Sequence, residues 1–445
     1  MKVSIIGTGY VGLVTGVCLA EKGHHVICVD VDPEKIETIN RAISPIHEKD
    51  LEELLRKNIH VRLHATTELK KAVLVTDVTL IAVGTPFNGS EIDLTSIKAA
   101  TEQIGTALQE KPSYHLVVVK STVVPGTTDS VVLPILEMAS GKKAGRDFGV
   151  GMNPEFLTEG EAVQDFMFPD RLILGGIDKK SVAVLGKLYN VFNGVEKLKT
   201  NNKTAELIKY TSNALLATLI SFSNEIGNLG AALGGIDAVE VMKGLHLSKY
   251  LSLTLPNGDR GVAPITSFLW PGCGFGGSCL PKDIKALIAH GEKAGRSMWL
   301  LDAVALINEQ QPQQVFALLK KHYSSLKGIR VAVLGLAFRP GTNDMRESPA
   351  IPIIKWLLAQ EAKIKAYDPA AKSEAQKIFA GVDIALCDDL SQAVTGAQAI
   401  VLVTRWEEFK RLPSLLAHLN PKPLVIDGRR MLNKSSVDRY DGVGL

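Results

Sequence analysis

The sequence has few cysteines and no motif typical of a metal site. There is no CxxC pair, and an odd number of cysteines argues against a disulfide framework. The five are Cys18, Cys28, Cys273, Cys279 and Cys387. The histidines form no HExxH motif, and HVRLH at 60–64 alternates like a strand edge or a surface segment. We therefore expect no bound metal, and a reducing cytoplasm is the natural setting.

The sequence also lacks blocks of basic residues and long apolar runs. Its net charge is only +3 and its basic residues are dispersed, so nucleic acid is not an expected partner. No apolar run approaches the length of a membrane span. The start, MKVSIIGTGYVG, enters a glycine turn where a signal peptide would continue its apolar region. We expect a cytoplasmic protein with no membrane partner.

The 445 residues are enough for two or three domains, and the composition is that of a soluble globular protein. In residues 1–200, apolar runs separated by helix-length segments predict a parallel α/β sheet. The predicted strands are VSII, HVICV, TLIAV, LVVVK and RLILGG. Residues 203–233 then carry apolar side chains at three- and four-residue steps, which predicts a long helix. This helix is a candidate spine between domains and a candidate subunit contact.

The two ends of the chain resemble each other. KVSIIGTGYVG matches RVAVLGLAFRPG, VICVDVDP matches IKAYDP, TLIAVGTP matches AIVLVTRW, and LVVVKST matches LVIDGRR. We predict an α/β protein with two Rossmann-like, doubly wound parallel-sheet domains, joined by a long central helix and a helical middle domain. The expected boundaries are 1–200, 201–312 and 313–445. Only the first end has the full dinucleotide fingerprint, so the second takes another ligand or serves structure and assembly.

A dinucleotide-binding loop is predicted directly after the first strand. Gly7, Gly9, Tyr10, Val11 and Gly12 belong to the motif GTGYVG, which opens a helix whose N-terminus faces an anion. The alternative is a glycine turn with no ligand.

Asp30 ends the second predicted strand, where a carboxylate contacts the ribose hydroxyls and repels a 2′-phosphate. NAD is therefore the expected cofactor rather than NADP, although Lys35 could weaken that preference. Thr85 in VGTP and Thr122 in KSTVVPG follow two further strands and are candidate cofactor contacts. Taken singly, they would be only strand-end caps.

Cys279 lies in the glycine-rich segment PGCGFGGSCLPKD, at 271–283. Lys282 could favour its thiolate, and Asp283 could position or deprotonate water. With a nicotinamide cofactor, an alcohol would be oxidised to an aldehyde, trapped by the thiolate, oxidised again to a thioester and hydrolysed to an acid. Cys18, Cys28 and Cys387 fit the role of small buried hydrophobes better.

These motifs together resemble the UDP-glucose/GDP-mannose dehydrogenase family over nearly the whole chain. The matching segments are GTGYVG, VDVDPEK, VGTP, STVVPGTT, NPEFLTEG, KYTSNA, GFGGSCLPKD, GLAFRPGTNDMRESPA and DGRR. The resemblance implies that Cys279 is the nucleophile and that Lys209 and Asn213, one helical turn apart, hold the reacting oxygens. Glu155 would be a general base or would position water, a task it would share with Thr122 and Asp283.

The resemblance also implies binding roles. Glu159, Lys282 and Arg346 would contact the cofactor, and the C-terminal domain would bind the nucleotide diphosphate. The implied substrate-binding residues are Glu155, Phe156, Leu157, Lys209, Asn213, Arg260, Phe268, Trp270, Gly276, Phe338, Arg339 and Arg429. Unaided, the charged members of this set would read as surface residues.

The chain departs from the family at two substrate-contacting positions. Ala263 stands where many members carry an arginine, and nearby Arg260 is a candidate replacement. Trp270 stands where a lysine or arginine is common, and an indole can stack on a sugar but cannot replace a charge. Both departures bear on the identity of the sugar rather than on the chemistry.

The resemblance implies four-electron, NAD-dependent oxidation of the C6 hydroxyl of a nucleotide sugar to a carboxylate. UDP-glucose is the first expected substrate, GDP-mannose the second, and UDP-N-acetylhexosamines come after both. Two other classes stay open: a two-electron hydroxyacid or 6-phosphogluconate-type dehydrogenase, and a catalytically silent NAD-binding module. A homodimer or higher homo-oligomer through the central helix is expected.

Overall fold

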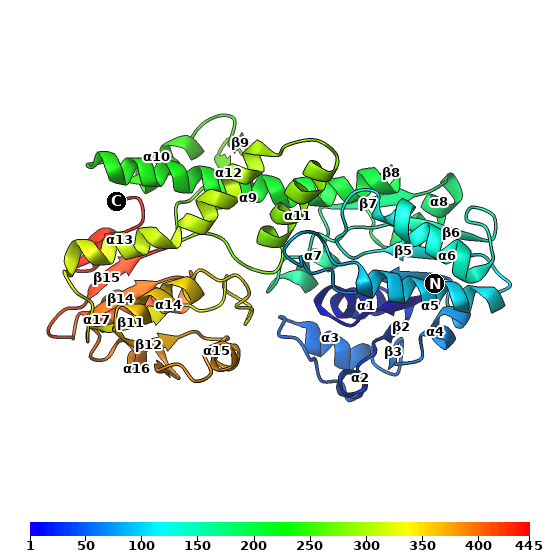
Figure 1. Ribbon diagram of the computed structural model, residues 1–445, viewed down its shortest axis with the longest axis horizontal. Coiled ribbons are helices and arrows are strands. Elements are labelled where there is room, and N and C mark those ends of the chain that lie inside the picture. The colour runs from blue at the N-terminus through cyan, green and yellow to red at the C-terminus, as the bar shows by residue number, and fades with distance from the viewer. Residues whose placement is uncertain (256) are drawn as a thin grey trace. The chain divides into compact units, whose positions relative to one another are not determined.

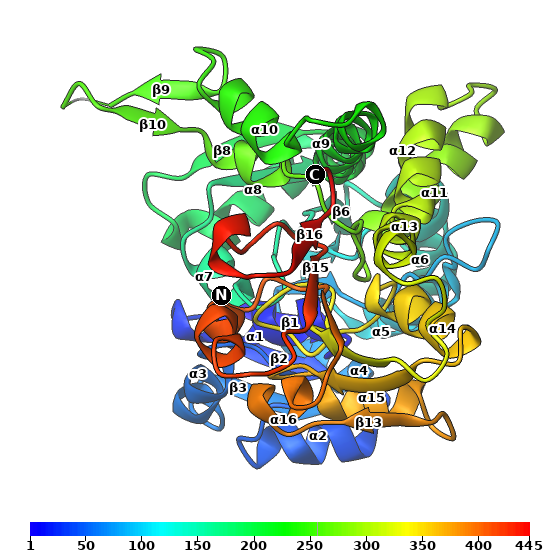
Figure 2. The ribbon, with the colours of Figure 1, turned by 90° about the vertical axis from the view of Figure 1, so that its left-hand side faces the viewer.

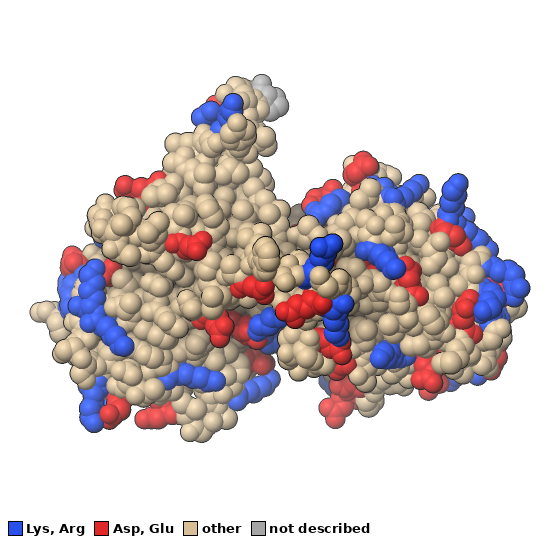
Figure 3. Space-filling model, turned by 45° about the horizontal axis from the view of Figure 1, so that its top comes forward, with Lys and Arg blue, Asp and Glu red and all other residues tan. Residues whose placement is uncertain are grey.

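The computed structural model describes residues 1–255 and 257–445. The chain forms two compact units, Met1–Ser212 and Asn213–Leu445, and helix α9 (Asn202–Leu233) runs from the first into the second (Figure 1). Within these described ranges no helix combines the length and apolar character needed to cross a bilayer. Lys and Arg side chains are interspersed with Asp and Glu over the face drawn in Figure 3.

The first unit contains an eight-stranded sheet in the order β3-β2-β1-β4-β5-β6-β7-β8. The strands are β1 (Lys2–Ile6), β2 (His25–Val29), β3 (Leu63–Thr66), β4 (Val78–Ile81), β5 (His115–Val119), β6 (Phe148–Met152), β7 (Arg171–Gly176) and β8 (Glu196–Thr200). The first six strands are mutually parallel, and their order is that of a dinucleotide-binding Rossmann sheet.

The predicted parallel sheet is confirmed for β1 to β6, but the predicted strand RLILGG, which forms β7, runs in the opposite direction. β7 pairs antiparallel with β6, and β8 follows the direction of β7. An antiparallel strand starts at the sheet edge where its predecessor ended. The connection of residues 153–170 therefore stays at the carboxyl edge of the parallel strands instead of crossing to the other edge. That connection carries NPEFLTEG.

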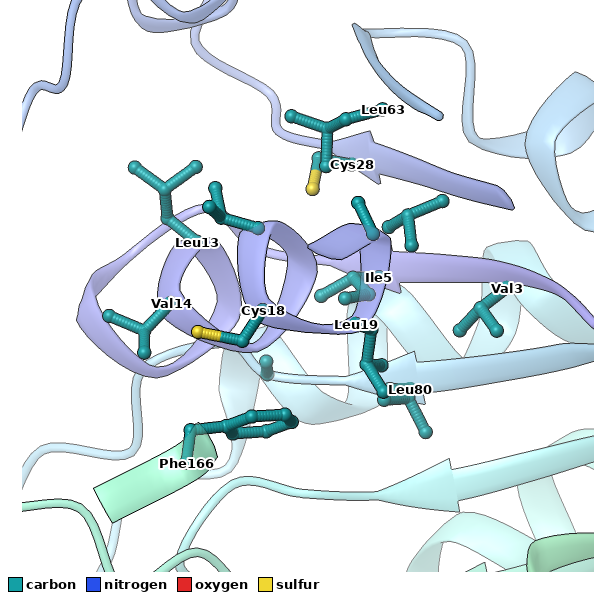
Figure 4. Packing of buried hydrophobic residues seen from close by; sticks show 14 of the residues in the cluster. Val3, Ile5, Leu13, Val14, Cys18, Leu19, Cys28, Leu63, Leu80 and Phe166 are labelled. Atoms are coloured by element: carbon teal, nitrogen blue, oxygen red, sulfur yellow. The ribbon is translucent and has the colours of Figure 1, made fainter. Parts of the chain in front are cut away.

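Most strands of the first unit are apolar because helices cover the sheet, and only the edge strand β8 is largely polar. Those helices are α1 (Tyr10–Glu21), α2 (Pro33–Asn40), α3 (Leu51–Asn58), α4 (Leu69–Val75), α5 (Thr95–Glu110), α6 (Leu133–Ser140), α7 (Ala162–Met167) and α8 (Lys179–Leu188). Figure 4 shows side chains of β1 to β4 packed against α1: Val3, Ile5, Cys28, Leu63 and Leu80 with Leu13, Val14, Cys18 and Leu19. Burial raises the pKa of the Cys18 and Cys28 thiols to about 12, as expected for cysteines that act as core residues.

The second unit contains a six-stranded parallel sheet in the order β13-β12-β11-β14-β15-β16. Its strands are β11 (Arg330–Leu334), β12 (Lys363–Tyr367), β13 (Ile384–Leu386), β14 (Ala399–Leu402), β15 (Leu424–Asp427) and β16 (Tyr440–Gly442). Numbered along the chain, this is the order of the first six strands of the first unit. The internal resemblance predicted from the sequence is confirmed, because the matched segments form β1 and β11, β2 and β12, β4 and β14, and β5 and β15.

The rest of the second unit is largely helical. Its helices after α9 are α10 (Ala238–His246), α11 (Leu280–Lys293), α12 (Trp299–Gln310), α13 (Pro312–His322), α14 (Ala350–Ala359), α15 (Lys372–Ile378), α16 (Leu390–Val394) and α17 (Leu412–Leu416). Strands β9 (Ser252–Thr254) and β10 (Arg260–Val262) form a hairpin that extends outward from α10 in Figure 2. The predicted long helix at 203–233 is confirmed by α9, which has 32 residues. The division into three domains stays a prediction.

Candidate active site

The glycine loop after β1 has the form that a pyrophosphate needs. Gly7 adopts φ +97°, and a Cβ there would lie 2.8 Å from the carbonyl oxygen of Ala82. A Cβ on Gly12 would lie 1.9 Å from the carbonyl oxygen of Gly7, so this glycine lets α1 pack against the turn. A Cβ on Gly9 would meet nothing within 4 Å. The backbone at Gly9 is therefore open to close approach by a ligand.

The predicted ribose-binding carboxylate lies beside this loop. Asp30 Oδ2 accepts hydrogen bonds from the backbone N–H of Thr8 (2.8 Å) and from its hydroxyl (2.7 Å). Burial opposes ionisation of Asp30, but these hydrogen bonds outweigh it and hold its pKa below the usual range. Lys35 Nζ lies 3.4 Å from the same oxygen. The first turn of α1 has no acidic residue and no side-chain cap, which leaves its N–H groups for an anion.

The loops after β4 and β5 are joined by hydrogen bonds. The hydroxyl of Thr85 donates to the backbone oxygen of Thr122 at 2.7 Å, and that of Ser121 donates to the backbone oxygen of Val83 at 2.7 Å. The two predicted cofactor contacts, Thr85 and Thr122, are thus brought together at the carboxyl edge of the sheet.

Glu155 and Lys209 form a buried ion pair in the first unit. Glu155 Oε1 lies 3.0 Å from Lys209 Nζ, and the two side chains are only 6% and 4% exposed. Oε2 of Glu155 accepts the backbone N–H of Leu157 at 2.7 Å. Burial raises the pKa of Glu155, but Lys209, this N–H and the charge of Lys120 more than offset it, so the net pKa is lowered. The reading of these two residues as solvated surface charges is excluded.

Glu48 joins the NPEFLTEG loop to the dinucleotide loop and was missed by the sequence analysis. It accepts hydrogen bonds from the hydroxyl of Tyr10 and from the backbone N–H groups of Gly160 (2.8 Å) and Ala162 (3.0 Å). Glu159, a predicted cofactor contact, is buried in the same loop. No local pattern around residue 48 indicated this contact, because its partners lie 38, 112 and 114 residues away along the chain.

Cys279 is the N-cap residue of α11 in the second unit. Its Sγ lies 3.5 Å from the hydroxyl oxygen of Ser278. It is partly exposed, whereas the other four cysteines are buried. The positive end of a helix favours a thiolate over a thiol, so this placement suits the predicted nucleophile.

Asp283, one turn into α11, links two other predicted residues. It is 2% exposed; its Oδ2 accepts the side-chain amide of Asn213 at 2.6 Å, and its Oδ1 lies 2.6 Å from Lys282 Nζ. Lys209 and Asn213 lie four residues apart on α9, which agrees with the predicted common helix face. The structure thus brings Asn213, Lys282 and Asp283 into one hydrogen-bonded group.

The glycines of the Cys279 loop pack against the segment that carries three predicted binding residues. A Cβ on Gly276 would lie 2.4 Å from the backbone oxygen of Glu347, and one on Gly277 would lie 2.8 Å from the Phe338 ring. The N–H of Gly277 donates to the backbone oxygen of Arg346 at 2.8 Å. The guanidinium of Arg346 is hydrogen-bonded to Asp344 at 2.7–3.0 Å. Arg339 follows Phe338 in the same segment and is partly buried.

The two arginines of DGRR have different surroundings. Arg430 is 4% exposed, pairs with Asp237 at 2.8 Å and donates to the backbone oxygen of Val443. Arg429 Nε donates to the backbone oxygen of Val403 at 2.5 Å, and its own backbone oxygen accepts from Arg405. Because Arg430 is committed to the fold, Arg429 stays the better candidate for the substrate.

Three of the predicted substrate-binding residues, Arg260, Phe268 and Trp270, lie on β10 or in the segment that follows it along the chain. Arg260 is exposed on β10, with Nη1 3.4 Å from the backbone oxygen of Leu247. Trp270 meets His246 edge to face, with ring centroids 4.6 Å apart. Phe268 ends the short helix that begins after Ala263. The described residues place no three His, Cys, Asp or Glu side chains so that they could hold a metal ion.

Three family models match consecutive parts of the chain. The NAD binding domain, the central domain and the UDP binding domain of the UDP-glucose/GDP-mannose dehydrogenase family match residues 1–193, 203–310 and 332–434. The chain belongs to the UDP-glucose/GDP-mannose dehydrogenase family. Its cofactor is NAD, and the open backbone at Gly9 together with Asp30 fits that dinucleotide.

Relatives within the family differ in their substrates. UDP-glucose 6-dehydrogenase AglM of Haloferax volcanii is 39% identical over 450 residues, covering 100% of both chains. GDP-mannose 6-dehydrogenase of Pseudomonas aeruginosa is also 39% identical, over 413 residues, covering 90% of this chain and 91% of that protein. The structure of a UDP-glucose dehydrogenase from Pyrobaculum islandicum superposes with a TM-score of 0.89 at 35% identity, covering 99% and 97% of the two chains. The chain is therefore an NAD-dependent nucleotide-sugar dehydrogenase of this family.

Proposed function

We propose that the protein oxidises the C6 hydroxyl of UDP-glucose to the carboxylate of UDP-glucuronate. The overall reaction consumes one water and two NAD and releases two NADH. Bound NAD supplies the hydride acceptor for each oxidation. The observation that carries this proposal is the position of Cys279, a partly exposed thiol at the N-terminus of α11 in a loop of tightly packed glycines.

Each proposed catalytic role matches the surroundings of its residue. Lys209, held by Glu155, would donate a hydrogen bond to the oxygen on which negative charge develops. Asn213 would do the same through its side-chain amide. Ionised Glu155 would accept a proton or orient water, since its pKa is held below the usual range.

Cys279 would act between the two oxidations. Its thiolate adds to the aldehyde carbon to give a thiohemiacetal, and loss of the second hydride leaves a thioester. Water, oriented by Asp283 and Thr122, attacks the thioester carbonyl and releases the acid and the thiolate. Asp283 suits this role because it is 2% exposed and held by Asn213 and Lys282.

GDP-mannose is the alternative substrate, and a relative of that specificity is as similar to this chain as the UDP-glucose relative. The UDP-glucose proposal has the support of the Pyrobaculum islandicum structure, which matches nearly the whole chain. We further propose the domain boundaries 1–200, 201–312 and 313–445, which the ranges of the three family models support.

The test is the yield of NADH with purified protein, NAD and a panel of nucleotide sugars. We expect two NADH per UDP-glucose consumed and a carboxylate product by mass spectrometry. A higher kcat/KM with GDP-mannose would reassign the sugar and leave the mechanism standing. One NADH per substrate with a ketone product would refute the four-electron reaction in favour of a two-electron dehydrogenase.

A further inference from the structure

Lys120 is a buried lysine at the carboxyl end of β5, directly before Ser121 and Thr122, and the sequence analysis gave it no role. The residue is only 3% exposed, and its Nζ donates a hydrogen bond to Asn153 Oδ1 at 2.9 Å. Asn153 follows β6, and its backbone N–H donates to Val119 on β5 at 2.9 Å. The neighbouring strands thus fix both ends of this contact.

Asn153 holds Lys120 at the loop that carries Glu155. Asn153 is two residues before Glu155 in the same loop, and its Oδ1 also accepts the hydroxyl of Tyr189 at 2.5 Å. The Phe166 ring centroid lies 5.9 Å from the ammonium, and the charges of Glu155 and Lys209 act on its pKa. The charges of two buried lysines, Lys209 and Lys120, therefore act on the single buried carboxylate of Glu155.

This arrangement disfavours two simultaneous positive charges. Burial and the charge of Lys209 lower the pKa of Lys120 to about 8, although Glu155 opposes that shift. A lysine in water titrates near 10.4, so Lys120 can exchange its proton close to neutral pH. Groups that interact this strongly titrate together, and the charge on any one of them depends on the other two.

We propose that Lys120 is a positioning residue that sets the charges carried by Glu155 and Lys209 during turnover, an inference that rests on the proposed oxidation. As a cation, Lys120 stabilises the carboxylate of Glu155 and disfavours the ammonium of Lys209. It acts through these two groups without touching the substrate. A purely structural Lys120 would instead only join β5 to the Asn153 loop.

The first test is the pH dependence of kcat/KM with the substrate that the wild-type protein oxidises. Lys120→Met removes the charge, and Lys120→Gln removes the charge but keeps a donor for Asn153. Loss of a nearby cation raises the pKa of both Glu155 and Lys209. The acid limb of the kcat/KM profile, where the rate falls as pH is lowered, should therefore move to higher pH by about one unit in both variants.

Lys111→Met is the matched control. Lys111 is also buried in the first unit, but its Nζ donates to the backbone oxygens of Val73 and Leu74, and the carboxylate whose charge acts on its pKa is that of Asp77. This variant should lose stability and keep the wild-type acid limb. An unmoved limb in Lys120→Gln, or an equal movement in Lys111→Met, would overturn the proposal.

A second measurement separates this inference from the proposed function. Protein carrying lysine labelled with ¹³C at Cε would be titrated by NMR without substrate, and the Lys209 signal assigned with Lys209→Met. The titration midpoint of Lys209 should be higher in Lys120→Gln than in the wild type. Equal midpoints would overturn the inference even if UDP-glucose is oxidised. A higher midpoint would uphold the charge coupling even if no nucleotide sugar is oxidised.

Discussion

Cys279 has the same side chain as the other four cysteines but differs from them in its exposure and its place at a helix N-terminus. Cys273 lies six residues earlier in the same loop, yet it is fully buried, and burial raises the pKa of its thiol. Its Sγ lies 3.7 Å from the backbone oxygen of Val403, inside the second unit. One loop therefore contains an inert thiol and a partly exposed thiol at a helix N-terminus, which makes the two cysteines a matched pair.

Replacement of Cys279 should separate the two oxidations. Cys279→Ala should abolish acid formation and leave NAD affinity unchanged, because alanine cannot form the thiohemiacetal from which the second hydride is lost. Cys279→Ser should accumulate a slowly hydrolysing ester, detectable as a mass adduct on the peptide containing position 279. Cys273→Ala is the control and should keep turnover at a modest loss of stability. Acid production by Cys279→Ala near the wild-type rate would show that the aldehyde hydrate is oxidised without a covalent bond.

The sequence supplied candidate roles for residues that lie in short motifs, and none for residues that act through distant partners. Cys279, Glu155 and Lys209 belong to segments that resemble motifs of the family. Lys120 follows an apolar strand, where a lysine reads as a surface residue, and its partner Asn153 is 33 positions away. Glu48 has partners at even greater separation. A single sequence contains no local signal for such contacts.

Strands were predictable where they are apolar and lie inside the parallel sheet. β1 and β2 match the predicted segments closely, whereas β6 (FGVGM) and β8 (EKLKT) were missed. β6 is fully buried but has two glycines, which lower its β-propensity. β8 lies at the sheet edge, pairs with β7 alone and is largely polar. The reversed direction of β7 had no local signal, because strand direction is set by how the preceding connection packs.

Helix α9 presents an apolar stripe that predicts self-association. Leu215, Phe222 and Leu229 recur at intervals of seven residues and are 44–55% exposed. A seven-residue apolar repeat is typical of the seam between two packed helices. Phe222→Glu combined with Leu229→Glu should convert a dimer to a monomer in light scattering. Met138→Glu replaces an exposed apolar side chain on α6 and should leave the mass unchanged. An unchanged mass for the double variant would place any subunit contact elsewhere.

The two sheets share one strand order but present their carboxylates differently. Asp30 and Asp368 are equivalent, since each directly follows the second strand of its sheet. Asp30 is held mainly by Thr8 beside an open glycine turn. Asp368 is 3% exposed and accepts five hydrogen bonds. Four come from the backbone N–H groups of Leu336, Ala337, Ala370 and Ala371, and the fifth comes from the indole N–H of Trp406. In the second sheet, the position equivalent to the predicted ribose-binding carboxylate is thus occupied by hydrogen bonds within the fold.

This difference predicts that the same Asp→Asn substitution mainly lowers stability in the second sheet and mainly raises KM for NAD in the first. Asp368→Asn places an amide NH₂ against buried N–H donors and should lower stability by about 2–3 kcal/mol, with no change in KM for NAD. Asp30→Asn should raise KM for NAD roughly tenfold, the equivalent of about 1.4 kcal/mol, with a smaller loss of stability. Urea unfolding and initial rates measure the two effects. If Asp368→Asn raised KM for NAD at unchanged stability, the second sheet would itself bind a dinucleotide. Asp368 would then have to exchange its present hydrogen bonds for contacts with that ligand.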